Sequence, residues 1–219
     1  FMSKHRLQKM IVSLLIMVIM MSQFTMIASA AGNGGIIYKD GNPEAVTDGL
    51  LPAEGQVRSL VLMIDFPDQK FEESHTKEYV QNIMTGDEKS LSSFYQEASY
   101  GKLDMSQIDI FACTVEQNRE YYSKDDLELP GGELLLRDAL NQLEGDIDFS
   151  KYDSNQDGYT DAIYLYVAGN ASTYGAIYWP AMHHAYDVYQ NNNTRIRQYV
   201  LLTEECTYTS ICHETGHLL

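Results

Sequence analysis

The chain has 219 residues, of which 44% are hydrophobic and 21% charged, and this composition excludes an intrinsically disordered protein. With 31 acidic against 15 basic residues its net charge is −16, which makes nucleic acid and anionic membrane poor partners and fits a solvated surface, carboxylates for divalent cations, or both. Three cysteines, Cys113, Cys206 and Cys212, are too few for a disulfide framework, although a Cys206–Cys212 bridge stays open.

The first 30 residues have the pattern of a signal peptide. Three basic residues precede the apolar run 10–21, in which only Ser13 is polar, and this run is shorter than the roughly 20 residues that a membrane-spanning helix needs. Ala28-Ser29-Ala30 supplies the small residues of a cleavage site. We therefore expect cleavage after Ala30 and a secreted, extracellular protein without stable membrane association; an uncleaved anchor is the alternative.

Beyond the leader, the apolar pattern predicts strands interspersed with helices. Residues 31–57 are rich in Gly, Asn, Pro and Asp and are expected to form a flexible lead-in or propeptide remnant, with order beginning near Arg58. Strands are expected at 58–66, 103–111 and 162–168, helices at 76–84, 90–100 and 133–143, Tyr-rich strand and loop at 174–202, a turn at 191–193, and a last helix capped by Thr209 or Ser210. This mixture predicts an α+β domain with a mixed sheet over 58–219.

The segment His213-Glu214-Thr215-Gly216-His217 matches the pattern H-E-x-x-H. On a helix, residues four apart lie on one face, so both imidazoles can reach one ion. Imidazole nitrogens bind Zn²⁺ at about 2.0–2.1 Å, and zinc lowers the pKa of its bound water to roughly 7. We predict that His213 and His217 bind zinc and that Glu214 accepts the proton of that water and passes it to the leaving amine.

A catalytic zinc ion usually has three protein ligands, and the H-E-x-x-H pattern supplies two of them. We expect the third beyond Leu219, because the sequence ends two residues after His217, where H-E-x-x-H-x-x-G would place its glycine. The chain is therefore interpreted as truncated at its C-terminus, the N-terminal part of a catalytic domain that cleaves little protein by itself. The alternative is a chance match or a structural histidine pair, and chance alone has odds on the order of 1%.

An acidic segment, DSNQDGYTD at 153–161, resembles a calcium-binding loop. The expected Ca²⁺ ligands are Asp153, Asn155, Asp157, the Tyr159 carbonyl and Asp161. The twelfth loop position is Tyr164 in a predicted strand, which argues against an EF-hand. The calcium would be structural; a solvated Asx-turn loop without an ion is the alternative.

Further polar residues have two interpretations each. The pair His183-His184 either lines the cleft or supplies a ligand, or it is a packing or surface pair. Glu204 and Glu205 either orient a ligating imidazole or form an exposed acidic turn, which we favour. Cys113 or Cys206 as a nucleophile would need a partner histidine that the sequence does not indicate.

Four segments together resemble the immune inhibitor A family of secreted bacterial metallopeptidases, in the same order and with similar spacing over about residues 58–219. They are RSLVLMIDFPD (58–68), SLSSFYQEASYGKLDM (90–105), YDSNQDGYTDAIYLYVAG (152–169) and CHETGHLL (212–219). The resemblance implies a zincin-like catalytic domain, zinc-dependent endopeptidase activity on extracellular proteins, and calcium as a structural ion. It carries over to His213, Glu214, His217 and the acidic loop only, because the family's downstream ligand and cleft residues are absent here.

Two functional hypotheses follow from these observations. The first is a secreted zinc endopeptidase whose partners are protein or peptide substrates. The second is a noncatalytic, calcium-stabilised extracellular binding module with a vestigial zinc motif; the intact Glu214 argues against such decay.

Overall fold

The computed structural model describes residues 37–39, 42–44, 50–143, 145 and 147–219. The predicted leader and its cleavage site lie outside these residues. None of the helices within the described part combines the length and the apolarity needed to cross a bilayer.

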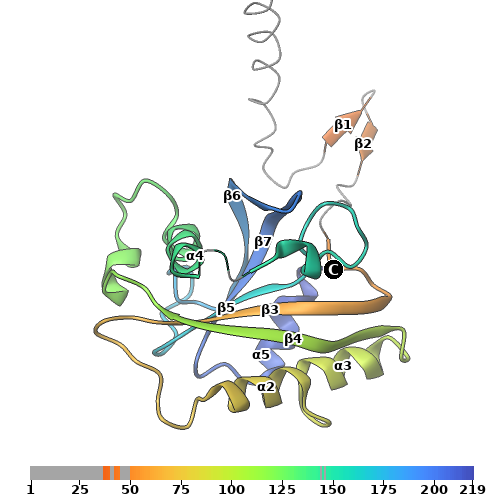
Figure 1. Cartoon of the computed structure of the whole chain (residues 1–219), viewed down its shortest axis with the longest axis horizontal. Helices are drawn as coiled ribbons and strands as arrows, with labels where there is room; N and C mark the ends of the chain where they lie inside the picture. Colours follow the sequence, from red (N-terminus) through yellow and green to blue (C-terminus); the bar gives the residue numbers. More distant parts are fainter. Residues whose placement is uncertain (1–36, 40–41, 45–49, 144, 146) are drawn as a thin grey trace, which may run out of the picture. The chain divides into compact units, whose positions relative to one another are not determined.

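Five strands form a mixed sheet in the order β4-β3-β5-β7-β6 (Figure 1). Their bounds are β3 Gly55–Asp65, β4 Leu103–Thr114, β5 Ile163–Val167, β6 Ala181–Asn191 and β7 Thr194–Thr203. The first four in the sheet are parallel, and β6 pairs antiparallel with β7 at the edge. Strands β1 (Ile37–Lys39) and β2 (Asn42–Glu44) pair in a separate two-stranded sheet.

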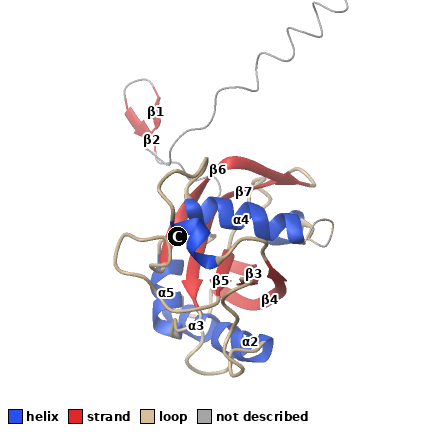
Figure 2. Cartoon of the chain, turned by 90° about the vertical axis from the view of Figure 1, so that its left-hand side faces the viewer, coloured by secondary structure: helices blue, strands red, loops and turns tan. Residues whose placement is uncertain are grey.

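Helices cover both faces of the five-stranded sheet, as Figures 1 and 2 show. Helix α4 (Gly131–Gln142) lies on one face, and α2 (Lys77–Thr85), α3 (Leu91–Ala98) and α5 (Tyr208–Gly216) lie on the other. Short 3-10 helices occur at η1 (Arg119–Ser123) and η2 (Phe149–Tyr152). Because a central parallel strand is buried on both sides, it forms a nearly continuous apolar run, as β3 and β5 do.

The alternation of side chains along the strands divides the interior into two cores. Leu60, Leu62 and Ile64 of β3 face α4. Val61 and Met63 face the three other helices. This division places the candidate zinc helix α5 in the second core.

The mixture of strands and helices with a mixed sheet confirms the coarse prediction for the fold. All predicted strands and helices are present, and Asn192 and Asn193 adopt positive φ in the turn between β6 and β7. Structure begins before Arg58: β3 starts at Gly55, and the buried Leu51 donates its N–H to the Leu218 carbonyl at 2.8 Å.

The predicted cap of the last helix was wrong. Helix α5 begins at Tyr208, and its N-cap is Thr207, whose side chain makes no capping bond. Instead, Thr207 Oγ1 lies 2.7 Å from Thr209 Oγ1. Thr209 and Ser210 cannot be the N-cap, because both lie inside the first turn of the helix.

Candidate metal centre

Helix α5 has one buried and one exposed face. Its buried residues, together with Leu218 just beyond its end, follow helical spacing into the second core: Ile211, Cys212, Thr215 and Leu218. His213 and His217 lie on the opposite, exposed face, and Glu214 is half-buried between the two faces. The apolar side therefore fixes the helix, and both imidazoles are directed away from the core.

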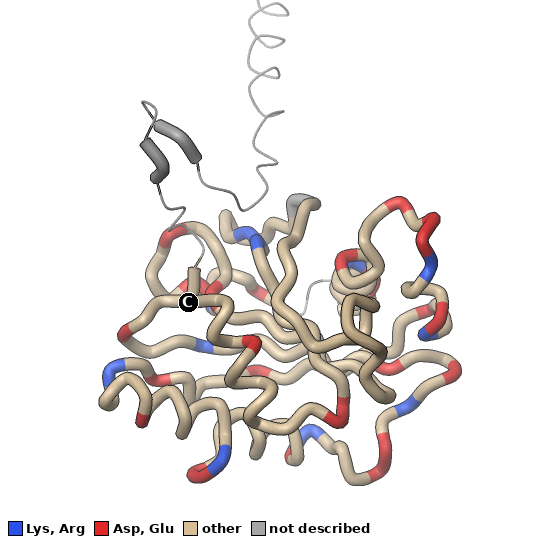
Figure 3. The backbone as a smooth tube through the Cα atoms, turned by 180° about the vertical axis from the view of Figure 1, so that it is seen from behind, with Lys and Arg blue, Asp and Glu red and all other residues tan. Residues whose placement is uncertain are grey.

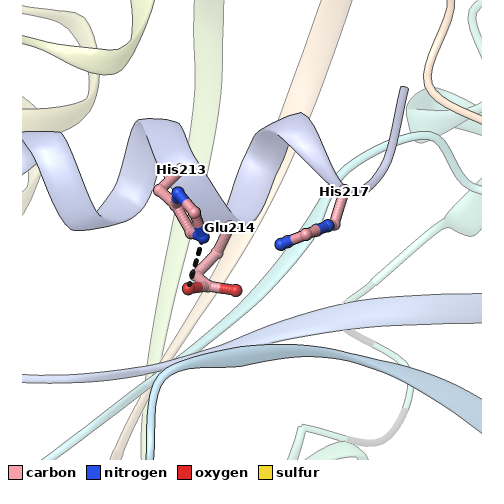
Figure 4. A group of neighbouring side chains, drawn as sticks. All are labelled: His213, Glu214 and His217. Atoms are coloured by element: carbon pink, nitrogen blue, oxygen red, sulfur yellow. Dashed lines mark ion pairs between the residues drawn. The ribbon is translucent and has the colours of Figure 1, made fainter.

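The three polar side chains are grouped closely (Figure 4). One ligand atom from each of His213, Glu214 and His217 lies within 4.8 Å of the others, and this is the one such group of three among the described residues. The imidazole centroids are 5.2 Å apart with the rings at 83°. His213 Nε2 lies 3.9 Å from Glu214 Oε1.

These residues fit a zinc ion. Two nitrogens at about 2.0–2.1 Å from a tetrahedral ion are about 3.4 Å apart, so small rotations of side chains already within 4.8 Å are sufficient. The His213 side chain is 70% exposed, which leaves space for an ion and further ligands, whereas the Glu214 side chain is only 12% exposed. Neither ring is enclosed by apolar neighbours.

Two tyrosines hold α5 from inside the protein. The Tyr95 hydroxyl of α3 donates to the Cys212 carbonyl at 2.9 Å, and burial raises the pKa of Tyr95 to about 12. Thr215 Oγ1 donates to the Ile211 carbonyl at 2.7 Å. The buried Tyr164 hydroxyl therefore acts as the donor to Thr215 Oγ1 at 3.0 Å. Cys212 and Thr215, the residues on either side of His213 and Glu214, are thus both held by a tyrosine.

Gly216 does not need to be a glycine for space. A Cβ there would meet the Tyr95 hydroxyl at 3.5 Å, an ordinary contact, and the residue is exposed. A small side chain at this position is therefore tolerated, because the facing atom is a side-chain oxygen at normal distance.

A cavity of about 640 Å³ borders the group. Its walls come from the β5–β6 loop, from the turn after β7, and from α5 with His213 and Glu214. The loop contributes Tyr174 and Trp179, whose rings form an edge-to-face pair at 5.6 Å. Sequence reasoning missed these two aromatic residues, because an irregular loop has no periodicity that would reveal them.

The prediction that Glu204 lies in an exposed acidic turn was wrong. Glu204 is 3% exposed, and its carboxylate accepts the N–H groups of Gly169 (2.7 Å) and Glu72 (3.0 Å) and lies 3.3 Å from His75 Nδ1. Glu205, in contrast, is exposed, accepts the Ala171 N–H at 2.8 Å and lines the cavity.

His183 lies away from the metal group. Its ring stacks on Tyr199 at 5.4 Å, and Tyr199 belongs to the core on the α4 side of the sheet. Burial and the neighbouring His184 lower the pKa of His183. The packing interpretation of this histidine is therefore the one that the structure favours.

The acidic loop is ordered by its own hydrogen bonds. Asp153 accepts the N–H groups of Asp157 and Gly158 at 3.0 Å, and Asp161 Oδ2 accepts from Ser154 N and Oγ at 2.7 and 2.6 Å. Asp161 is 1% exposed, and its Oδ1 makes no hydrogen bond with the described residues. Burial, with the charges of Asp153 and Asp157, raises the pKa of Asp161 to about 6. Calcium binding here stays a prediction.

The three cysteines are free thiols. Burial raises the pKa values of Cys113 and Cys212 to about 11 and raises that of Cys206 as well. A nucleophilic cysteine needs a lowered pKa, so this environment argues against a cysteine hydrolase.

The charge distribution agrees with the acidic composition. In the view of Figure 3, the described Lys and Arg positions are separated from one another, and acidic positions recur along the same loops.

No protein-family model matches the chain, and no curated protein matches it.

Proposed function

We propose that this chain belongs to a secreted zinc-dependent endopeptidase with a zincin-like catalytic domain that hydrolyses peptide bonds of extracellular proteins. The observation that carries the proposal is the group His213, Glu214 and His217, with ligand atoms within 4.8 Å on a helix face that borders a cavity of about 640 Å³. A structural histidine pair would not need a half-buried carboxylate beside it or an open cavity in front.

The roles follow from position. His213 and His217 would hold the ion, which when bound supplies Lewis-acid chemistry that polarises a carbonyl and acidifies water. Glu214 faces the cavity with a side chain that is 12% exposed, so its carboxylate is shielded but reachable. It accepts a proton from the attacking water and donates it to the leaving amine. Tyr95 and Tyr164 keep the helix in place during these transfers.

The second candidate is the calcium-stabilised binding module. The buried Asp161 oxygen without a hydrogen bond to the described residues favours an ion in the acidic loop. Such an ion is compatible with either function, because a structural calcium stabilises an enzyme equally well. The two candidates differ in the role of Glu214: the peptidase needs this residue for cleavage, whereas the binding module cleaves nothing.

The deciding experiment combines metal analysis with proteolysis, on protein expressed from its complete reading frame. We expect about one equivalent of zinc, and casein cleavage that Glu214→Gln lowers by at least about 10²-fold while zinc is retained. His213→Ala and His217→Ala should each lose zinc. His183→Gln, on the other side of the sheet, is the matched control and should keep both. Calcium without zinc, or equal cleavage by Glu214→Gln, would contradict the peptidase proposal.

A further inference from the structure

The cavity beside Glu214 contains two aromatic side chains that solvent can reach. Trp179 is 40% exposed and Tyr174 is 86% exposed. Exposed aromatic rings at a concave site are typical of ligand contacts, because an isolated fold gains more by burying them. The pair therefore needs an explanation beyond packing.

The loop that carries this pair is held in a defined shape. Backbone bonds join Ser172 N to the Tyr178 carbonyl at 3.1 Å and Trp179 N to the Ala176 carbonyl at 2.9 Å. Tyr178 is 2% exposed, and its hydroxyl donates to the Arg119 carbonyl at 2.6 Å. The loop is thus anchored through Tyr178, and its neighbour Trp179 is presented to the cavity.

The charged residues that line the cavity are acidic: Glu205 and Glu214 contribute carboxylates, and no Lys or Arg of the described part of the chain lines it. One oxygen of Glu205 accepts the Ala171 N–H, and the other has no hydrogen-bond partner among the described residues. Arg119, whose charge acts on Glu205, is bound elsewhere. Its guanidinium donates to the carbonyls of Ala168 and Asn170 and stacks on Tyr178 at 3.7 Å.

We propose that this cavity is a subsite for a basic side chain, arginine before lysine, of a peptide substrate. The planar guanidinium stacks on the face of one ring of the Trp179–Tyr174 pair and donates to the Glu205 carboxylate. Glu214 and His213 border the same cavity, so a peptide held by this side chain has a bond close to the candidate zinc site. As a substrate class, the proposal rests on the proposed peptidase function.

Binding can be measured without catalysis, because Trp179 is the single tryptophan of the chain. The probes are acetyl-Ala-Arg-Ala-amide and its Leu and Glu counterparts, titrated against Trp179 fluorescence. We expect the Arg peptide to bind about 5- to 10-fold more tightly than the Leu peptide, with the Glu peptide weakest. Glu205→Gln should remove most of this preference, and Glu205→Lys should favour the Glu peptide.

Glu54→Gln is the matched control, since Glu54 is an exposed carboxylate paired with Lys102 outside the cavity, and it should change nothing. Tighter binding of the Leu peptide, a flat fluorescence titration with all three, or an Arg preference that survives Glu205→Gln would each overturn the subsite. Cleavage sites mapped on casein separate the two proposals. With protein from the complete reading frame, Glu214-dependent cleavage without enrichment of Arg or Lys beside the cut refutes the subsite alone. An Arg preference in binding without any cleavage by that protein refutes the peptidase.

Discussion

Replacing Thr215 by valine should destabilise the protein by about 1–3 kcal/mol, because the Tyr164 hydroxyl, which is 0% exposed, would lose its acceptor 3.0 Å away. Tyr164→Phe should cost less, about 0.5–1.5 kcal/mol, because Thr215 keeps its bond to the Ile211 carbonyl. The double replacement removes both hydroxyls, so no unpaired hydroxyl of this pair remains in the interior. Its cost should therefore be below the sum of the single costs, by about 1–2 kcal/mol.

The assay is urea unfolding followed by circular dichroism for the four proteins of this cycle. Tyr174→Phe, at an 86% exposed position, is the control and should change the free energy of unfolding by less than about 0.5 kcal/mol. A zinc titration of the same proteins tests whether the anchor also affects the helix face with His213 and His217. Single costs that add within about 0.3 kcal/mol in the double variant would refute the argument that this buried pair anchors α5.

Three further predictions concern Gly216, Asp161 and two of the cysteines. Gly216→Ala should raise the free energy of unfolding by about 0.4–1 kcal/mol in a urea titration, since a Cβ there meets only Tyr95 Oη at 3.5 Å; a loss of stability would show that the contact is tighter. The pKa of Asp161, raised to about 6, means that the folded state holds this proton more tightly than the unfolded state. Without calcium, wild-type stability should thus fall relative to Asp161→Asn as pH rises from about 4 to about 6, and added Ca²⁺ should reverse the loss only in the wild type; parallel pH curves would contradict this. Burial raises the pKa values of Cys113 and Cys212 to about 11, so both thiols should react with a thiol reagent at pH 7.5 more slowly in the native than in the unfolded protein; equal labelling rates would contradict this.

The elements could be predicted because their signals are local. A central parallel strand is apolar throughout, as β5 is. Helix α3 begins where Ser90 and Ser93 form a reciprocal capping box. The spacing of His213 and His217 places both rings on one face of any regular helix. The grouping of these two residues could therefore be predicted without knowing any long-range contact.

The parts that sequence could not reveal depend on contacts between distant segments. Glu204 and Glu205 are adjacent and chemically identical, yet one is buried and the other is exposed. The groups that bind the Glu204 carboxylate, Glu72, His75 and Gly169, all lie at least 35 residues earlier in the sequence. For the same reason the cavity was not foreseen, since it lies between a loop and a helix that no periodic pattern relates.

The buried Glu204 explains how an exposed loop can form one wall of a defined cavity. Its backbone N–H donates to the Val167 carbonyl, and its carboxylate accepts the Gly169 N–H, so the end of β7 is joined to the end of β5. Both walls of the cavity begin directly after these joined residues. The loop with Trp179 follows Gly169, and the turn into α5 follows Glu204. A carboxylate whose hydrogen bonds are formed in the interior costs more to displace than one in solvent. The bases of both cavity walls are therefore fixed where β5 and β7 end, and the buried Tyr178 anchors the loop beyond that point. The geometry of the candidate site thus depends on buried contacts and not on the exposed part of the loop.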